Sequence, residues 1–319
     1  MSHHPVSSDI RFSAGAVIEP ANLVNMRALA GFLPLHKQRK ILSDLSGSHA
    51  SAVRGRGLDY AEVRAYQPGD DIRAMDWRVT ARTGDAHIKV FKEERERPVI
   101  IVCDLRSGMH FGTRRAFKSV LAADLSALLA WAAMDHGDRI GALLFSDQDE
   151  TDLRPKTGRK QVLQLINALS REHPQAFREG RMAQMCRHLR RVIRPGSAVY
   201  FISDFAGFDD ECEQQLFNLT QHSDLVAIQV SDPLEAELPP PGVYNFAYQN
   251  TRQRVNAADK TLRQRYHQVW LQRQQQLRHH MLRLKTPLIS LSTSSSDPMS
   301  ALRSGLGLQS VSRHSGSRS

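Results

Sequence analysis

Residues 98–104, PVIIVCD, decide the fold class of this 319-residue chain. An unbroken apolar run that ends in an aspartate is typical of a strand buried on both faces of a sheet. Both faces of such a strand need apolar neighbours, so helices are expected to cover the sheet on each side. The rest of the chain should therefore supply further parallel strands and the helices that cover them.

The sequence after residue 104 alternates between apolar strands and amphipathic helices. Strand-helix-strand units of this length predict an α/β fold of the Rossmann type, with a mainly parallel sheet and helices on both faces. Ligands in such sheets bind beyond the carboxyl ends of the strands, which here are Asp104 and Asp204. The expected strands are 139–145, 149–155 at an edge, 197–204, 224–230 and 287–292, and the expected helices are 117–131, 159–170, 181–193, 209–221 and 258–285.

Composition and patterning divide the chain into five parts. We predict a disordered leader at 1–20, N-terminal helices at 21–52, a charged β-rich segment at 53–97, the α/β domain at 98–291 and a disordered Ser-rich tail at 292–319. The leader and the tail are assigned from their Ser and Gly content, because such sequences have few side chains to bury.

The segment 53–97 differs from its surroundings because it holds ten Lys and Arg and nine Asp and Glu. Its short alternating stretches at 61–66 and 87–91 predict strands, and the Pro-Gly-Asp-Asp sequence at 68–71 predicts a turn between them. Exposed ion pairs contribute only about 0–1 kcal/mol each. This charge density therefore suggests an ion-pair network or a docking surface, and fold stability alone is a weak reason for it.

The overall composition, with 41% apolar and 24% charged residues, is that of a globular protein. Its three widely spaced cysteines predict neither a disulfide framework nor a zinc motif, and no apolar run is long enough to span a bilayer. We therefore expect a cytoplasmic protein. Residues 251–319 hold twelve Lys and Arg against two acidic residues, so this end carries the net charge of +10. It could attract an acidic protein, nucleic acid or anionic lipid, or form a solvated basic face.

The segment 55–97 carries, in order, a Gly-rich start, an Arg-x-Tyr step, a Pro-Gly-Asp-Asp turn, an Asp-Trp pair and an Ala-Arg pair. This order resembles the signature of the bacterial domain-of-unknown-function family 58 (DUF 58). The resemblance continues more loosely to about residue 290, where the family is similar to von Willebrand factor A domains. It implies a cytoplasmic accessory or adaptor of MoxR-type AAA+ ATPases, with no established reaction. The signature residues that this reading assigns to partner binding are Arg64, Tyr66, Asp70, Asp71, Arg73, Asp76, Trp77 and Arg82.

The von Willebrand factor A resemblance also implies a metal-ion-dependent adhesion site, which would hold Mg²⁺ through oxygen ligands. Such a site uses Asp-x-Ser-x-Ser after the first strand, a Thr from a second loop and a later Asp. The matching positions here form a degenerate site of Asp104, Arg106, Ser107, Thr157 and Asp204. We predict that Arg106 replaces the cation by pairing with Asp104 or Asp204, so that no metal is bound. The alternative is that Arg106 points to solvent.

A phosphate-binding loop is not expected at 112–119, GTRRAFKS. Phe117 replaces the second glycine, whose missing side chain lets backbone N–H groups close on phosphate. We interpret this stretch as a helix start in which Phe117 faces the core.

Besides electrostatic docking of the basic C-terminal end on membrane or nucleic acid, two functional hypotheses from different classes fit the sequence. The first is a non-enzymatic interaction module with no catalytic residue and no cofactor. The second is a metal-dependent hydrolase or phosphotransferase that uses Asp104, Asp204 and the Asp70-Asp71 turn, since paired carboxylates can hold two metal ions.

Trp77 is the largest apolar side chain in a polar stretch, so we expect it to be buried against the α/β domain. His279 and His280 are expected to be solvated on the last helix. The stripe on that helix expected to cover the sheet consists of Leu262, Tyr266, Val269, Trp270, Leu277, Met281 and Leu284.

Overall fold

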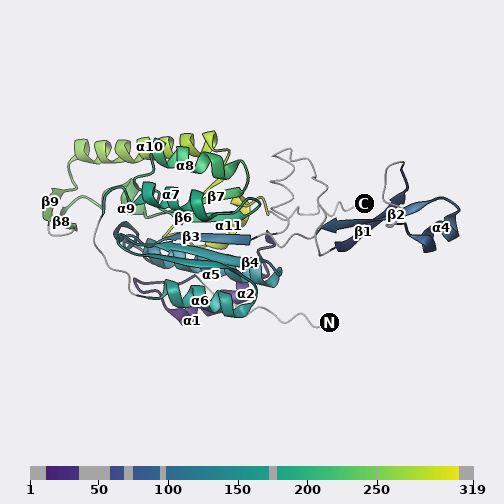
Figure 1. The fold of residues 1–319 in the computed structure, drawn as a ribbon. Coiled ribbons are helices and arrows are strands. Elements are labelled where there is room, and N and C mark those ends of the chain that lie inside the picture. Colours follow the sequence, from purple (N-terminus) through teal and green to yellow (C-terminus); the bar gives the residue numbers. More distant parts are fainter. Residues whose placement is uncertain are drawn as a thin grey trace, which may run out of the picture. The chain divides into compact units, whose positions relative to one another are not determined.

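The computed structural model describes residues 12–35, 58–67, 75–93, 98–171, 178–248 and 251–308. These residues belong to two compact units (Figure 1). The smaller unit is Gly47–Glu96, and the larger unit joins Met1–Ser46 to Arg97–Ser319. The expected turn at 68–71 and most of the second expected N-terminal helix lie outside the described residues.

The larger unit is built on a six-stranded sheet with the order β10-β7-β6-β3-β4-β5. Neighbouring strands are parallel except for β5, which pairs antiparallel with β4 at the edge. This confirms the expected mainly parallel α/β sheet. The strands are β3 (Pro98–Asp104), β4 (Arg139–Phe145), β5 (Glu150–Lys156), β6 (Ala198–Ser203), β7 (Asp224–Ser231) and β10 (Leu288–Ser292).

Helices cover both faces of this sheet (Figure 1). One face packs against a layer that contains α1 (Pro20–Asn25), α2 (Arg27–Ala30), α5 (Lys118–Asp135), α6 (Arg159–Leu169) and α11 (Pro298–Gly305). The other face packs against α7 (Arg181–Val192), α8 (Asp210–Thr220) and α10 (Lys260–Arg283).

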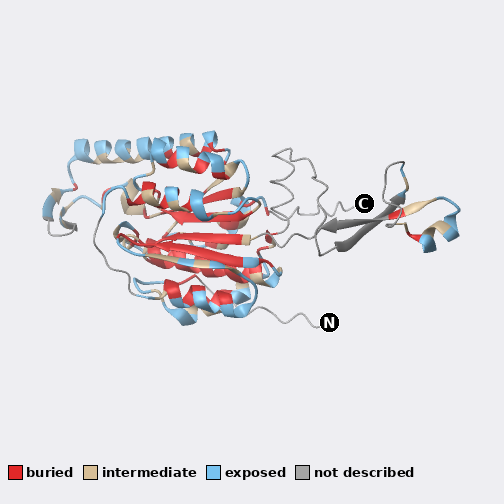
Figure 2. Ribbon diagram, in the orientation of Figure 1, coloured by how far each residue is buried: buried red, intermediate tan, exposed pale blue. Residues whose placement is uncertain are grey.

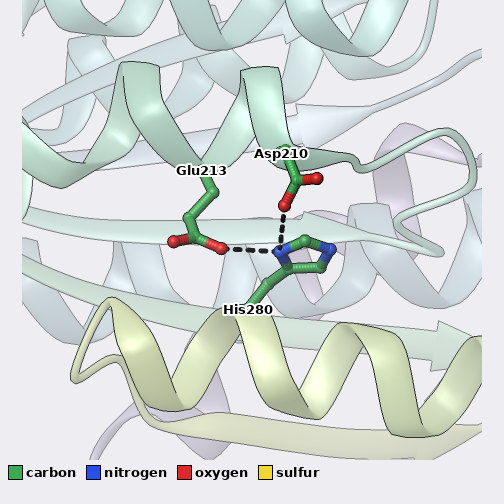
Figure 3. Close-up of side chains that lie close together, drawn as sticks. All are labelled: Asp210, Glu213 and His280. Carbon is green, nitrogen blue, oxygen red and sulfur yellow. Dashed lines mark hydrogen bonds and ion pairs between the residues drawn. The ribbon is translucent and has the colours of Figure 1, made fainter.

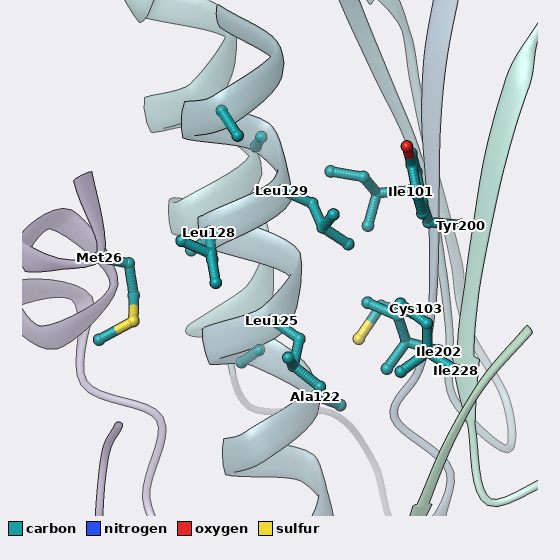
Figure 4. Close-up of a cluster of buried hydrophobic side chains, with 14 of the residues drawn as sticks. Met26, Ile101, Cys103, Ala122, Leu125, Leu128, Leu129, Tyr200, Ile202 and Ile228 are labelled. Carbon is teal, nitrogen blue, oxygen red and sulfur yellow. The ribbon is translucent and has the colours of Figure 1, made fainter. Parts of the chain in front are cut away.

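Strand β3 shows why its sequence is apolar throughout. Val99, Ile101 and Cys103 belong to the hydrophobic cluster under α5, whereas Ile100 and Val102 belong to the cluster under α7 and α8. Successive side chains of a strand point to opposite faces, so both faces of a central strand need apolar residues. Figure 4 shows the first cluster, in which Ile101 and Cys103 face the α5 side chains.

Helix α5 is the most deeply buried helix of the larger unit, with sixteen of its eighteen residues buried (Figure 2). The sheet lies on one side of it, and α1, α2 and α6 pack on its other sides. The indole Nε1 of Trp131 donates to the carbonyl of Leu23 at 3.0 Å, which ties α1 to α5. Within the described part of the chain, no helix is both long enough and apolar enough to cross a bilayer.

The expectation of a disordered leader at 1–20 is wrong for residues 12–19. Phe12 is buried, and the backbone N–H and hydroxyl of Ser13 donate to the Asp124 carboxylate on α5 at 2.5 and 2.7 Å. Gly15 forms a parallel bridge with Ala116. A few specific contacts therefore order a segment whose composition alone suggested disorder, while residues 1–11 lie outside the described part.

The expectation of a disordered tail at 292–319 is also wrong for residues 293–308. Asp297 caps α11 by accepting from the Ser300 N–H at 2.9 Å, and Leu302, Leu306 and Leu308 are buried in the cluster under α5. Gly305 lets this helix approach β10, because a Cβ there would come within 2.7 Å of the Ile289 side chain. The α/β domain therefore extends beyond residue 291.

Residues 232–256 contain elements that the sequence analysis did not foresee. They form the short helix α9 (Pro233–Ala236) and an antiparallel hairpin of β8 (Val243–Tyr248) and β9 (Thr251–Asn256). The long helix α10 (Lys260–Arg283) follows this hairpin and confirms the helix expected at 258–285. The expected apolar stripe covers the sheet only at its C-terminal end, where Leu277, Met281 and the cap residue Leu284 are buried. Leu262 and Val269, in the first half of the helix, are exposed.

The smaller unit consists of an antiparallel pair, β1 (Leu58–Ala65) and β2 (His87–Glu93), with the unforeseen helix α4 (Trp77–Thr83) between them. Both expected strands are confirmed. Asp76 is the N-cap of this helix, and its carboxylate accepts hydrogen bonds from backbone N–H groups of the first turn. Within the smaller unit the Trp77 side chain is 66% exposed, so this unit does not bury it, and its burial against the α/β domain stays a prediction.

Candidate functional site

Each of four parallel strands brings one aspartate to the carboxyl edge of the sheet. Asp104 ends β3, while Asp147, Asp204 and Asp232 each follow a serine just beyond β4, β6 and β7. Asp104, Asp147 and Asp232 are buried, and the Asp204 side chain is only 9% exposed. Burying carboxylates requires compensating charges or hydrogen-bond donors. This edge is also where α/β sheets bind ligands, so it is the candidate site.

Arg106 neutralises two of these carboxylates. Its Nε and NH2 atoms donate to Oδ1 and Oδ2 of Asp104 at 3.0 and 2.7 Å, and NH2 lies 3.4 Å from Oδ1 of Asp204. Its NH1 atom donates to the carbonyl of Ala206 at 3.1 Å, and its guanidinium lies over the Phe145 ring. Burial disfavours the charged guanidinium, but Asp104 and Asp204 outweigh this effect and raise the pKa of Arg106. The side chain therefore takes the inward position expected of a cation substitute.

Lys118, the first residue of α5, supplies a second buried cation. Its Nζ lies 2.7 Å from Oδ2 of Asp204 and 2.5 Å from Oε1 of Glu235, and its side chain is 2% exposed. Burial alone would raise the pKa of Asp204, but Lys118 and Arg106 together lower it. This role of Lys118 was not predicted from the sequence, and Phe117 was expected in the core instead. Phe117 is in fact the half-buried cap residue. A single lysine at the head of an apolar helix was the available signal, since buried lysines need a partner.

The remaining acceptor positions of Asp104 are also occupied. The Ser203 hydroxyl donates to Oδ2 at 2.6 Å and the Arg106 backbone N–H donates to Oδ1 at 3.0 Å. The Ser203 hydroxyl in turn accepts from the N–H of Phe205, a residue held at a φ of 56°. Asp104 thus fixes the loops that follow both β3 and β6.

Asp147 and Asp232 bind backbone and hydroxyl groups instead of cations. Oδ2 of Asp147 accepts from the Ser107 N–H at 2.7 Å, in the short 3-10 turn that follows β3. Asp232 accepts from the hydroxyls of Thr113 and Thr293 at 2.6 and 2.5 Å, and also caps α9. Burial acts to raise the pKa of Asp232, but these hydrogen bonds lower it. Repeated Ser-Asp pairs after apolar strands were the sequence signal for both residues.

The loop that carries Asp147 is fixed by a buried arginine on α7. Arg181 donates to the carbonyls of Ser146 and Asp149 at 2.7 and 2.9 Å, and its NH1 pairs with Glu150 at 2.6 Å. The Asp147 carboxylate therefore belongs to a rigid edge, which is tied to the helices as well as to the sheet.

Thr157 does not contribute to this edge. It is exposed and follows β5, whose Lys156 pairs with Ile140 near the start of β4. Since β5 runs antiparallel to β4, its end lies at the opposite edge of the sheet. The assignment of Thr157 to the degenerate site is therefore wrong, and threonine hydroxyls reach the edge from Thr113 and Thr293 instead.

The signature residues belong to the smaller unit. Tyr66 is half-buried, and its N–H donates to the Ala86 carbonyl at 2.8 Å. Asp76, Trp77 and Arg82 lie in or next to α4. The side chain of Arg64 and residues Asp70, Asp71 and Arg73 lie outside what the structure describes.

Comparison with known proteins places the chain in a family. The DUF58 family model, described as a protein of unknown function, matches residues 62–276. The chain belongs to the DUF58 family. This match begins in β1 and ends in α10, so both units of the DUF58 chain take part in it.

Relatives of this DUF58 chain include the uncharacterized proteins Rv1480 of Mycobacterium tuberculosis and Mb1516 of Mycobacterium bovis. Each is 31% identical over 238 residues, which cover 72% of this chain and 74% of the relative. Among solved structures, BatB of Bacteroides thetaiotaomicron aligns with a TM-score of 0.41 and 13% identity, over 66% of this chain and 97% of BatB. An aerotolerance-related membrane protein of Bacteroides fragilis aligns with a TM-score of 0.40 and 14% identity, over 67% and 100% of the two chains.

The carboxylates of this edge are engaged in ion pairs and hydrogen bonds, whereas the buried hydroxyl of Ser107 has no hydrogen-bond partner among the described residues. The oxygens of Asp104 that could bind a divalent ion are held by a guanidinium and a hydroxyl. The Thr113 hydroxyl donates to Asp232, but the lowered pKa of Asp232 makes it a weak proton acceptor at neutral pH. In the described residues of this DUF58 chain, the arrangement is suited to holding loops in a fixed shape.

Proposed function

We propose that this DUF58 chain is a protein-interaction module that works in the cytoplasm as an accessory partner of a MoxR-type AAA+ ATPase. In this proposal the larger unit is a von Willebrand factor A-like scaffold, and the smaller unit docks the partner. The observation that carries the proposal is the exposure of Trp77 on α4, within the family signature.

The exposed face of α4 has the chemistry of a binding surface. Trp77 is 66% exposed, and the neighbouring Arg78 and Arg82 are exposed too. Trp and Arg are the residues most often found to dominate binding energy at protein interfaces. The Asp76 carboxylate accepts from the N–H groups of Arg78 and Val79 at 3.1 and 3.2 Å, so the start of this surface is held in place before binding.

The described part of the small unit buries few side chains. Among its residues whose side chains are described, only Asp76 and Ile88 are buried. A two-stranded hairpin is only marginally stable in water without a further packing surface. A partner that covers α4 would supply such a surface, which couples binding to the stability of this unit.

The basic outer face of α10 offers a second contact for an acidic partner. Lys260, Arg265, Arg273 and Arg278 are exposed, and the helix contains no acidic residue. Contacts of this kind are screened by salt. Partner binding should therefore weaken as ionic strength rises, but should not disappear if α4 provides the main contact.

The carboxyl edge supports a metal-independent version of this function. An A-type adhesion site would use Mg²⁺ to organise its loops, whereas here Arg106 and Lys118 organise them from within the chain. We therefore propose that partner binding needs no divalent ion at Asp104. Binding in the presence of a chelator would be unchanged, and a loss of binding on chelation would contradict this part of the proposal.

The central experiment measures binding between the purified full chain and the MoxR-type ATPase of the same organism by biolayer interferometry. Trp77→Ala should weaken binding strongly, since interface tryptophans often contribute about 2 kcal/mol or more. Phe217→Ala is the matched control, because Phe217 is an exposed aromatic residue on α8 of the other unit. Absence of binding by the unmutated chain, or equal binding by Trp77→Ala, would overturn the proposal.

A further inference from the structure

A cluster of three possible metal ligands lies where α8 meets α10, away from the carboxyl edge described above. Asp210 and Glu213 come from the first turns of α8, and His280 comes from the last turns of α10 (Figure 3). One ligand atom from each of the three side chains lies within 4.8 Å of the other two. His280 was expected to be solvated, but its side chain is only 12% exposed.

The three groups converge on one ring nitrogen. His280 Nδ1 lies 2.7 Å from Oε2 of Glu213 and 3.9 Å from Oδ1 of Asp210. The first distance is a hydrogen bond, while the second is too long for one. The His280-Glu213 hydrogen bond therefore does not include the Asp210 carboxylate, although Figure 3 shows it directed at the same nitrogen.

The two inner ligands are held by contacts from outside the cluster. Arg283 Nε pairs with Oε1 of Glu213 at 2.9 Å, which leaves Oε2 facing the histidine. The ring of Phe208 packs edge-on against the His280 ring, with centroids 5.5 Å apart. A second group that holds a ligating carboxylate, as Arg283 holds Glu213, is typical of protein metal sites.

We propose that Asp210, Glu213 and His280 bind one zinc ion that links α8 to α10. An imidazole nitrogen with two carboxylate oxygens suits Zn²⁺, whereas Mg²⁺ prefers oxygen ligands alone. Ligand atoms around a tetrahedral zinc lie about 3.3 Å apart. Small side-chain rotations that open the His280-Glu213 contact and close the His280-Asp210 distance would form this arrangement.

The ion would reinforce a helix that has few buried contacts. Leu277 and Met281 are the buried residues of α10, and both lie within one turn of His280. Arg283 NH1 lies 4.0 Å from Oδ1 of Asp210, so its charge competes with the ion and moderates the affinity. Three protein ligands leave a fourth position for water, as in zinc sites that stay open to solvent.

The test titrates the full chain with zinc chloride by calorimetry and follows the melting temperature, with magnesium chloride as the comparison. We expect one Zn²⁺ per chain and a rise in Tm, because an ion that binds only the folded state stabilises it. His280→Gln and Glu213→Gln should remove both effects. His279→Gln is the matched control, since the neighbouring His279 is exposed and should leave zinc binding unchanged.

A loss of fold in His280→Gln or Glu213→Gln would be visible as a lower Tm without metal. In that case Asp210→Asn decides, because the Asp210 side chain is 83% exposed and its loss should not disturb packing. We expect this substitution to weaken zinc binding by about ten-fold or more. The proposal would be overturned if the unmutated chain bound no zinc, if Asp210→Asn kept the full zinc affinity, or if His279→Gln lost zinc binding to the same extent. The cluster would then be only a hydrogen bond between His280 and a carboxylate.

Discussion

The carboxyl edge of the larger unit and helix α4 of the smaller unit use charged side chains in opposite ways. At the edge, Arg106 and Lys118 are almost fully buried, and each binds at least two acceptors. On α4, Arg78 and Arg82 are exposed beside an exposed Trp77. A charge that is paired inside the chain stabilises the fold, whereas charges beside an exposed aromatic ring are available to a partner.

The largest effect should come from removing the last elements of the larger unit. A chain that ends at Ser292 loses Leu302, Leu306 and Leu308, and burial of each leucine contributes about 1.5–3 kcal/mol. We expect a loss close to the whole stability of a typical domain, measured by urea unfolding followed by circular dichroism. A chain that ends at Leu308 is the control. Equal stability of the two truncated chains would show that α11 is dispensable.

Replacing the cation substitute should have the next largest effect. Arg106→Ser leaves the carboxylates of Asp104 and Asp204 without the guanidinium, and breaking a buried pair costs about 3–5 kcal/mol. The loss should appear as a lower urea midpoint in buffer without metal. Arg154→Ser on strand β5 is the control. It removes the same guanidinium group from an exposed residue that takes no part in the carboxyl edge.

The same variant distinguishes cation replacement from simple packing. A serine at position 106 adds a hydroxyl ligand beside Asp104, so Mg²⁺ should recover part of the lost stability. Magnesium should have little effect on the unmutated chain. Stoichiometric Mg²⁺ binding at Asp104 in the unmutated protein, seen by calorimetry, would contradict the role given to Arg106.

Two buried aspartates should give opposite pH dependences. Burial raises the pKa of Asp124 to about 6, despite the hydrogen bonds from Ser13, whereas Lys118 and Arg106 hold the pKa of Asp204 below its ordinary value. Between about pH 4 and 6 the unfolded chain ionises Asp124 and the folded chain keeps it protonated, so this residue lowers stability as pH rises. Asp204 instead contributes stability above its ordinary pKa, which is lost as pH falls.

Asp124→Asn separates these two effects. The amide cannot ionise, so relative to the unmutated chain the variant should gain about 1–3 kcal/mol between pH 4 and pH 7. Its loss of stability at more acidic pH should remain, because the contacts of Asp204 are intact. Urea midpoints across this range provide the measurement. A relative stability that does not change with pH would show that Asp124 ionises normally in the folded chain.

The elements of the sheet were predictable because their signals are local. The apolar run 98–104 and its successors are specified by neighbouring residues, and the two ends of the chain were misjudged for the same reason. Composition at 1–20 and 292–319 did not reveal that single residues such as Phe12 and Leu302 fit the surface of the larger unit. Short segments of this kind are ordered by tertiary contacts, which local sequence does not encode.

The candidate site was predictable where one loop contains both partners. Arg106 and Asp104 are two residues apart, so their pairing follows from a short turn. The contact of Lys118 with Asp204 joins residues 86 positions apart, and that of Thr113 with Asp232 joins residues 119 apart. Such pairs depend on which strand ends are neighbours in the sheet, and that order became available only with the fold.

The smallest effect on stability should come from Trp77, in contrast to another tryptophan of the same chain. Trp131 is buried and donates to the Leu23 carbonyl, so Trp131→Ala should cost about 3–5 kcal/mol. Trp77 is 66% exposed, and substitutions of exposed residues usually change stability by less than about 0.5 kcal/mol. Thermal unfolding of both variants measures the contrast. A clear fall in Tm for Trp77→Ala would mean that the ring is covered within the folded chain, and would remove it from the proposed partner surface.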